Sequence, residues 1–397
     1  MSNIHATYHT AEELSEKSSS GAQEVANDQQ QQHHHAFQRP HRQAGQMELG
    51  LASIVQDRES PRSVVPAAGL SDMEFRKRWE QWRPELLVAC VGEILGVIFY
   101  VSFGGFSLAT LIVTTYAGSP QGSLLNVALS YALGIAFAVI IAAPLSGSHL
   151  NPCVTISLWL YKGFPAWKIP IYIMCQLLGG LLGGFLVVAC WHDELLAIAA
   201  ELTAKGKEAV IYSASGPAGV IALFPTPGRS YGAIFATEFI ADFLIGLVIA
   251  THLDSSNPFV SPVSAPIMIG LAYFAMIVGL ASGDLATNTA RDLPTRMVCA
   301  AFFDPRQCFP PRYSALTALT NILATLLAFG MQTFLLSDTR RPPAPVAHHF
   351  LLEEEKRKHD LHVKTHEDML DRRIQKVISR GGDPSALEAK RTISRMP

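Results

Sequence analysis

Polar and apolar residues divide the chain into three unlike stretches. Residues 1–83 are mostly polar, residues 84–337 are mostly apolar, and residues 338–397 are densely charged. A membrane-spanning helix needs about 20 largely apolar residues. Six runs in the middle stretch approach or exceed this length, the fifth being short: Glu85–Val113, Leu125–Leu145, Ile169–Trp191, Ile234–Leu253, Pro266–Leu280 and Ala315–Leu336. The pattern predicts an all-α membrane protein with six transmembrane helices.

A soluble protein with six buried helices is the alternative interpretation. A surface helix of a soluble protein keeps a polar face, but the second, third and fifth runs contain almost no charge. The whole chain is only 16% charged, against the roughly 25% that is typical of soluble domains. A membrane bundle is therefore favoured, with the lipid bilayer as its surroundings.

The two ends of the chain read as tails. Residues 1–83 carry QQQQ and HHH runs and lack the early apolar core of a secretory signal peptide, so they predict a disordered tail. His33, His34 and His35 have no second ligand cluster, and we expect no metal site there. Residues 338–397 predict a charged extension, with gating or partner binding as the alternative.

Basic residues predict the orientation. Lys and Arg collect in the cytoplasmic loops of membrane proteins, and such residues precede the first run and follow the last: Arg76, Lys77, Arg78, Arg83, Arg340 and Arg341. With six spans, both termini are expected in the cytoplasm and the loop 192–230 outside. The plasma membrane is the expected location.

Two polar segments, each beginning a new helix with Asn, interrupt the apolar stretch. They are SGSHLNPCVTI (146–156) and ATNTARDLP (286–294). Each half of the stretch reads helix, helix, Asn-led segment, helix. Three spans per half invert the second half in the membrane, an arrangement that marks channels and transporters.

Non-helical backbone survives at membrane depth only where it lines a cavity or is buried in protein. Asn151 suits a helix N-cap and Pro152 the first helical position, and Asn288 would begin the second half-helix. The two half-helices would then meet end to end, with their positive dipole ends at a pore. Such a pore opposes cations and protons, while the Asn side chains can donate to a neutral solute.

The segments HLNPCVT and NTARD resemble the two signature boxes of the major intrinsic proteins, the aquaporins and aquaglyceroporins, and are most like those of the aquaglyceroporin branch. Glu93, Glu238 and Gln176 support the resemblance, which covers residues 84–337. It implies six spanning helices plus two re-entrant half-helices in an inverted repeat, and a homotetramer. It also implies that Glu93 and Glu238, with His149 and Asp292, support the re-entrant loops.

Three positions depart from the family pattern. Cys153 replaces the Ala of the first box, Thr289 replaces the Pro of the second, before Ala290, and LPTR stands where Gly-Pro-Arg is frequent. Thr is tolerable at a first helical position, so the second half-helix should survive. The Cys153 thiol either reaches the constriction or packs behind it, and packing is favoured.

The resemblance also implies a selectivity filter. Arg291 matches the filter arginine, Tyr131 the aromatic position and Leu285 a third position, while the helix-five position is either Ile277 or Val278. The Asp at 292 is typical of glycerol-conducting members. For Asp284 three interpretations remain open, namely pairing with Arg291, pointing into the outer vestibule, and surface solvation.

The sequence thus predicts a passive channel for small neutral solutes, most of all glycerol and related polyols with some water. A secondary transporter that couples ions through Glu93 and Glu238 is one alternative, and a non-conducting receptor or scaffold is another. No catalytic constellation or Gly-rich phosphate loop stands out, so no enzyme activity, cofactor or nucleic-acid partner is expected. The six cysteines have no metal-type or disulfide-type spacing and are predicted to be small hydrophobes, with Cys153 as the one exception discussed above: Cys90, Cys153, Cys175, Cys190, Cys299 and Cys308.

Overall fold

The computed structural model describes residues 82–280, 284–338, 340–342 and 373–379, together with Trp79, Ala344, Leu370 and Asp383. Within these residues every regular element is a helix. This confirms the predicted all-α fold class. The predicted disorder of the N-terminal tail, its three neighbouring histidines and most of the C-terminal extension lie outside the described residues.

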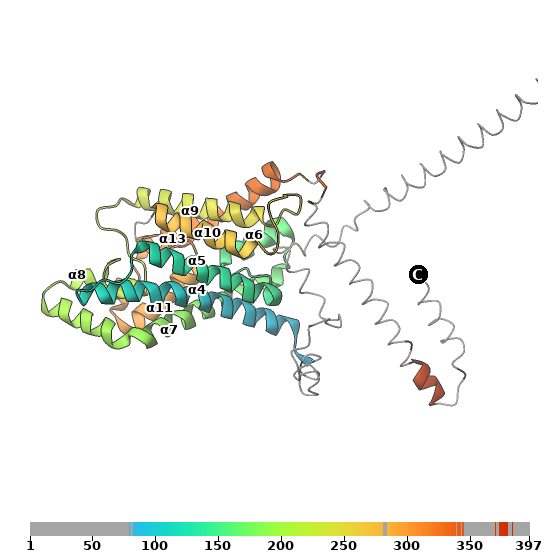
Figure 1. Ribbon diagram of the computed structural model, residues 1–397, viewed down its shortest axis with the longest axis horizontal. Helices are drawn as coiled ribbons and strands as arrows, with labels where there is room; N and C mark the ends of the chain where they lie inside the picture. Colours follow the sequence, from blue (N-terminus) through green and yellow to red (C-terminus); the bar gives the residue numbers. More distant parts are fainter. Residues whose placement is uncertain are drawn as a thin grey trace, which may run out of the picture. The chain divides into compact units, whose positions relative to one another are not determined.

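Five helices of the described part are long and apolar enough to cross a membrane, and a further apolar helix is shorter (Figure 1). The five are α4 (Glu85–Tyr116), α5 (Leu124–Ser146), α7 (Ile169–Ala204), α9 (Tyr231–Thr251) and α13 (Pro311–Met331). The shorter one, α10 (Ala265–Leu280), matches the short fifth run of the sequence. Large apolar side chains such as Leu129, Phe137 and Leu244 are exposed on these helices, as expected of a surface that faces lipid.

Two short helices begin at the polar interruptions, α6 (Pro152–Lys162) and α11 (Thr289–Phe302). Each packs against the last long helix of the opposite half of the chain, α6 against α13 and α11 against α7. The long helix α5 and the shorter α10 also pack against each other across the two halves. This exchange ties the halves of the inverted repeat together.

Glycines let α7 approach its neighbours closely. A Cβ on Gly179 would lie 2.6 Å from the backbone oxygen of Ile94 in α4, and one on Gly180 would lie 2.1 Å from the backbone oxygen of Ala290 in α11. Gly183 and Gly184 continue the same two contacts one turn further along the helix. Small residues at four-residue spacing therefore serve packing within the chain.

The third helix is longer than its apolar run. The predicted span ends at Trp191, where the backbone leaves helical geometry, but α7 continues to Ala204. Its last turns bury Leu195, Ile198 and Leu202, which pack with residues of the following loop. The hydropathy pattern therefore locates the end of the apolar run at Trp191. The helix continues beyond it because one face of the added turns is apolar and buried. The helices α8 (Glu208–Ile211) and η2 (Pro217–Val220) follow.

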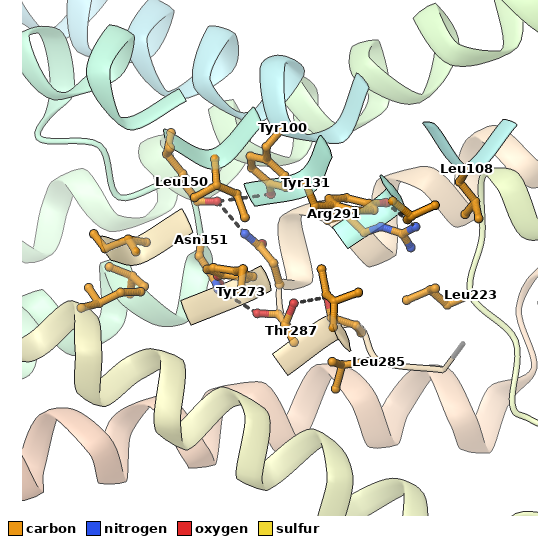
Figure 2. A pocket seen from close by; sticks show the side chains of 18 of the residues that line it. Tyr100, Leu108, Tyr131, Leu150, Asn151, Leu223, Tyr273, Leu285, Thr287 and Arg291 are labelled. Carbon is orange, nitrogen blue, oxygen red and sulfur yellow. Dashed lines mark hydrogen bonds between the residues drawn. The ribbon is translucent and has the colours of Figure 1, made fainter. Parts of the chain in front are cut away.

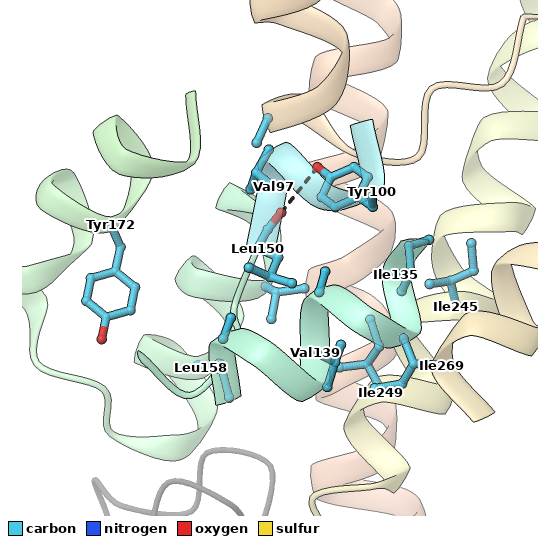
Figure 3. Packing of buried hydrophobic residues seen from close by; sticks show 14 of the residues in the cluster. Val97, Tyr100, Ile135, Val139, Leu150, Leu158, Tyr172, Ile245, Ile249 and Ile269 are labelled. Carbon is cyan, nitrogen blue, oxygen red and sulfur yellow. Dashed lines mark hydrogen bonds between the residues drawn. The ribbon is translucent and has the colours of Figure 1, made fainter. Parts of the chain in front are cut away.

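One buried cluster of apolar side chains joins the two halves (Figure 3). Val97 and Tyr100 come from α4, Val139 from α5, and Ile249 and Ile269 from α9 and α10. Between helices in a membrane, such side chains contribute through close van der Waals packing rather than through removal of apolar surface from water. The cluster surrounds the ends of the two half-helices and so fixes their position.

The cysteine prediction was wrong for two residues. Cys299 in α11 and Cys308 in α12 (Pro305–Cys308) form a disulfide, with Cα atoms 5.8 Å apart. Their spacing of nine residues is uninformative by itself, because only the turn after α11 brings the two sulfurs together. Among the described residues Cys90, Cys153 and Cys175 are free and partly or fully buried, and Cys190 is free and exposed.

Candidate functional site

The two Asn residues cap the two half-helices as their sequence predicts. The Asn151 side chain accepts a hydrogen bond from the backbone N–H of Cys153 at 3.0 Å, and Pro152 is the first helical residue. The Asn288 side chain accepts from the backbone N–H of Ala290 at 2.8 Å, and Thr289 begins the helix. Thr in place of Pro therefore leaves the second half-helix intact, because neither residue needs to donate at that position.

The same Asn side chains join the two half-helices to each other. The Asn288 Nδ2 donates to the carbonyl of Leu150 at 2.9 Å, and the Asn151 Nδ2 donates to the carbonyl of Thr287 at 3.3 Å. The preceding backbone is left-handed at Ser148, Leu150 and Thr287. Such strain in non-glycine residues persists only where the surroundings hold it, and it collects at functional sites.

A buried glutamate supports each re-entrant loop. Glu93, which is fully buried, accepts from the backbone N–H groups of His149 at 3.0 Å and Leu150 at 2.8 Å, and from Gln176 Nε2 at 2.7 Å. His149 packs its ring between Phe164 and Tyr172. The strained first loop thus has its backbone donors satisfied by a carboxylate.

Glu238 does the same for the second loop. It accepts from the backbone N–H groups of Ala286 at 2.9 Å and Thr287 at 2.6 Å, and it is 1% exposed. Neither Glu238 nor Glu93 lines the cavity described next. Their geometry fits a supporting role and offers no ion-coupling site.

A cavity of about 160 Å³ extends to both sides of the paired Asn residues (Figure 2). Val139 and Ile249 line one end, and Leu108 and Leu223 line the other. Seven of the residues predicted from sequence line it: Tyr131, His149, Asn151, Ile277, Leu285, Asn288 and Arg291. The remaining predicted residues do not line it: Glu93, Pro152, Cys153, Glu238, Val278, Thr289, Ala290 and Asp292.

The predicted filter residues lie together on the side of the Asn pair that leads to Leu108 and Leu223, which is the outer side in the predicted orientation. Arg291 is 6% exposed and donates from one terminal nitrogen to the Tyr131 hydroxyl at 3.1 Å. Its other terminal nitrogen, Nη1, has no hydrogen-bond partner within the described residues and lies 4.0 Å from Asp292 Oδ1. Ile277 lines the cavity, whereas Val278 is 41% exposed on the outside of α10. The open choice at helix five therefore falls on Ile277.

The two altered box positions meet each other behind the cavity wall. The Cys153 thiol donates to Asn321 Oδ1 at 2.6 Å and lies 3.8 Å from the Thr289 hydroxyl. Asn321 in turn donates to the carbonyl of Thr287 at 2.9 Å. Cys153 is fully buried, so its placement matches the packing interpretation. Asn321 was missed from sequence, since nothing in its apolar helix points to it.

The position of Asp284 contradicts two of its three interpretations, surface solvation and pairing with Arg291. It is 1% exposed and forms an ion pair of 2.9 Å with Arg229 of the loop between α7 and α9, which excludes surface solvation. The backbone N–H of Thr226 also donates to it at 3.3 Å. Arg229 rather than Arg291 is its partner. The pair holds the segment that leads to Leu285.

A second ion pair lies behind the filter. Arg296 is fully buried, pairs with Asp292 at 2.9 Å and lies over the ring of Tyr313. It also donates to the carbonyls of Leu223 at 2.8 Å and Cys308 at 3.2 Å. Because Leu223 lines the outer end of the cavity, Asp292 acts through Arg296 on the shape of that end.

The loop between α7 and α9 contributes directly to the cavity, which the sequence did not indicate. Ala214, Gly219 and Leu223 line its outer end. A Cβ on Gly219 would lie 2.2 Å from the backbone oxygen of Ser213, so only glycine permits this turn. The one feature of the sequence that could have pointed to this contact is the small residues of SASGPAGVIAL (213–223), because small residues let a loop approach other segments closely.

Comparisons with known proteins agree with this geometry. The family model of the major intrinsic proteins matches residues 79–306. An aquaporin of Laccaria bicolor is 36% identical over 290 residues, which cover 70% of this chain and 94% of that protein. The glycerol uptake facilitator protein of Pseudomonas aeruginosa is 31% identical over 219 residues, which cover 54% of this chain and 75% of that protein.

The fold has a solved counterpart as well. The X-ray structure of the aquaglyceroporin from Plasmodium falciparum superimposes with a TM-score of 0.53 at 21% identity, covering 63% of this chain and 97% of that one. At this identity the likeness concerns the fold alone. Together with the family model and the paired half-helices, it leaves one assignment. The chain belongs to the major intrinsic protein family, whose members are membrane channels and not enzymes.

Proposed function

We propose that the protein is a passive channel for small neutral solutes, with glycerol and water as its main solutes. The observation that carries the proposal is the cavity that continues past the paired Asn residues, lined by Arg291 and by apolar residues opposite it. Relatives named as an aquaglyceroporin and as glycerol uptake facilitators support the same solutes.

The arrangement of charge opposes ions. Two half-helices point their positive dipole ends at the Asn pair. Arg291 adds a buried guanidinium on the outer side. A cation or proton therefore meets a barrier at two successive levels, whereas a neutral solute does not.

The walls of the filter favour a solute with two different edges. Arg291 and Tyr131 offer hydrogen-bonding groups on one side, while Ile277 and Leu285 offer only carbon. Glycerol has hydroxyls along one edge and C–H groups along the other. Water gains few hydrogen bonds from the apolar side, so we expect it to permeate less efficiently than in a fully polar filter.

The orientation, location and assembly belong to the same proposal. We infer that residues 84–337 form the channel, that residues 1–83 and 338–397 lie in the cytoplasm, and that homotetramers reside in the plasma membrane. The Lys and Arg residues near the first and last helices support the orientation. The disulfide between Cys299 and Cys308 supports it too, because disulfides persist on the oxidising side of a membrane. The tetramer rests on family resemblance.

Stopped-flow light scattering of proteoliposomes tests the proposal. We expect fast glycerol uptake that rises linearly with concentration, and loss of cation exclusion in Arg291→Ala. Matched vesicles with Val278→Ala serve as the control, since that side chain faces outward. Saturation at low concentration or dependence on a proton gradient would favour a transporter instead. Absence of glycerol and water flux would favour a non-conducting receptor or scaffold.

A further inference from the structure

Two tyrosines line the cavity beside the paired Asn residues, and the proposed filter does not use them. Tyr100 comes from α4 and Tyr273 from α10, and they are 4% and 8% exposed. Figure 2 shows the Tyr100 hydroxyl directed at the Leu150 carbonyl and Tyr273 beside Asn151, whereas the Arg291 guanidinium lies farther along the cavity, toward Leu108 and Leu223. Phenylalanine would fill nearly the same space, so packing alone does not explain why these two side chains carry hydroxyl groups.

The backbone acceptors next to the Asn pair are already occupied. The Leu150 carbonyl accepts from Asn288 Nδ2 at 2.9 Å and from the Tyr100 hydroxyl at 3.5 Å. The Thr287 carbonyl accepts from Asn151 Nδ2 at 3.3 Å and from Asn321 Nδ2 at 2.9 Å. A carbonyl oxygen has two lone pairs, so the Thr287 carbonyl is filled, while the Leu150 carbonyl has one close donor and one distant one.

Each Asn side-chain oxygen already accepts one backbone N–H. Asn151 Oδ1 accepts from the backbone of Cys153, and Asn288 Oδ1 accepts from the backbone of Ala290. Each amide also donates one N–H to a carbonyl, so its second N–H is the donor that it offers to a solute in the cavity. A solute hydroxyl that accepts a hydrogen bond from these donors also needs an acceptor for its own O–H, because a buried donor without an acceptor costs free energy.

The phenolic oxygens supply acceptors at this level. Tyr273 lies beside Asn151 in Figure 2 and lines the same cavity. The Tyr100 hydroxyl uses its proton on Leu150 and keeps its oxygen available to accept. The rings hold both hydroxyls in fixed places, because a buried Tyr has only two side-chain torsions to restrict.

We propose that Tyr100 and Tyr273 form a second selectivity station, at which a solute hydroxyl accepts from an Asn amide and donates to a phenolic oxygen. The station favours solutes whose oxygens both accept and donate, which describes polyols and water. The inference rests on the proposed channel function and extends it from the outer filter to the centre of the pore.

Phenylalanine variants test the station without changing the size of the pore. Tyr100→Phe, Tyr273→Phe and the double variant are reconstituted, and glycerol uptake is measured over a range of temperatures. We expect permeability to fall roughly three- to tenfold in the double variant and less in each single one, as loss of one or two hydrogen bonds predicts. The activation energy for glycerol should rise in parallel.

Tyr172→Phe is the matched control. Its hydroxyl is also buried and donates to the Ser146 carbonyl at 3.0 Å, but it does not line the cavity. Unchanged or faster glycerol flux in the double variant, or an equal loss in Tyr172→Phe, would overturn the inference while leaving the channel function in place. No glycerol flux in the unaltered protein would remove both. The single variants decide the matter if the double variant does not fold.

Discussion

At the scale of single residues, the filter depends on ion pairs that do not touch the solute. The pair of Asp284 and Arg229 holds the chain just before Leu285, and its two members are unequally buried: the Asp284 side chain is 1% exposed and the Arg229 side chain 26%. A charge that has left water depends on its partner more than a charge that remains partly hydrated. The two single substitutions should therefore differ in cost.

We expect Arg229→Ala to destabilise the protein by about 3 kcal/mol, because it takes the cation away from a buried carboxylate. Asp284→Asn should cost about 1 kcal/mol, because the amide still accepts from the backbone of Thr226 and Arg229 can turn to water. Denaturation midpoints in detergent measure both values. The double variant Arg229→Gln/Asp284→Asn should be more stable than Arg229→Ala, and equal costs for the two single variants would contradict this account.

Local sequence predicted the residues that act through their own helix end. Asn151 and Asn288 stand in short motifs whose capping chemistry can be read without a structure, whereas Arg291 was assigned by the resemblance of its motif to a family box. Arg229, Arg296 and Asn321 could not be found in this way, because each acts on a segment more than 30 positions away or through a backbone carbonyl. Only the folded chain shows which carbonyl or carboxylate such a side chain reaches.

At the scale of elements, the contact between α7 and α11 controls the second half-helix. Gly180 lies where a Cβ would come within 2.1 Å of the Ala290 carbonyl and 2.9 Å of Pro294. We expect Gly180→Ala to cost roughly 1–3 kcal/mol, since overpacking forces the backbone to shift. Because α11 carries Asn288 and Arg291, glycerol permeability should fall as well.

Gly279 provides the control for this prediction. It lies in α10, and no heavy atom stands within 4 Å of an added Cβ. Gly279→Ala should change the free energy of unfolding by less than about 1 kcal/mol, in the stabilising direction if at all. Thermal denaturation and glycerol uptake of the two variants, measured side by side, check both expectations. Equal behaviour of the two would mean that the close approach of α7 to α11 is unimportant.

The disulfide joins the end of α11 to α12, close to the carbonyl that Arg296 uses. For a loop of nine residues, chain entropy predicts a stabilisation of about 2–3 kcal/mol. We expect the double variant Cys299→Ser/Cys308→Ser to lose that amount in chemical denaturation. Cys190→Ser changes an exposed free cysteine and should lose nothing measurable. If the double variant is as stable as the unaltered protein, the disulfide does not contribute to the stability of the fold.

The elements themselves were largely predictable, and their ends were not. Hydropathy located all six apolar helices, including the short α10, because lipid imposes one composition along a whole span. The extension of α7 beyond Trp191 was missed, since its buried Leu195 and Leu202 lie in an amphipathic segment whose partner is the loop around Val220. Where the partner is not lipid but another part of the chain, the pattern alone does not identify it.

At the scale of the whole molecule, the inverted repeat predicts which loops and termini lie on each side of the membrane. Six spans with cytoplasmic termini put the loop after α7 outside, on the same side as the disulfide and the outer filter. Gly206 lies in this loop in an open left-handed turn with no heavy atom near an added Cβ, so a short epitope inserted there should be tolerated.

In intact cells we expect an antibody to label an epitope inserted after Gly206 but not one at either terminus. After permeabilisation all three should be labelled equally. Glycerol uptake by the same cells shows that the tagged chains fold. An epitope inserted after Lys162, the last residue of α6 and the end away from Asn151, gives the matched cytoplasmic control. Terminal labelling in intact cells would reverse the orientation. The filter at Arg291 would then face the cytoplasm, and the disulfide would lie in a reducing compartment, where such bonds are rare.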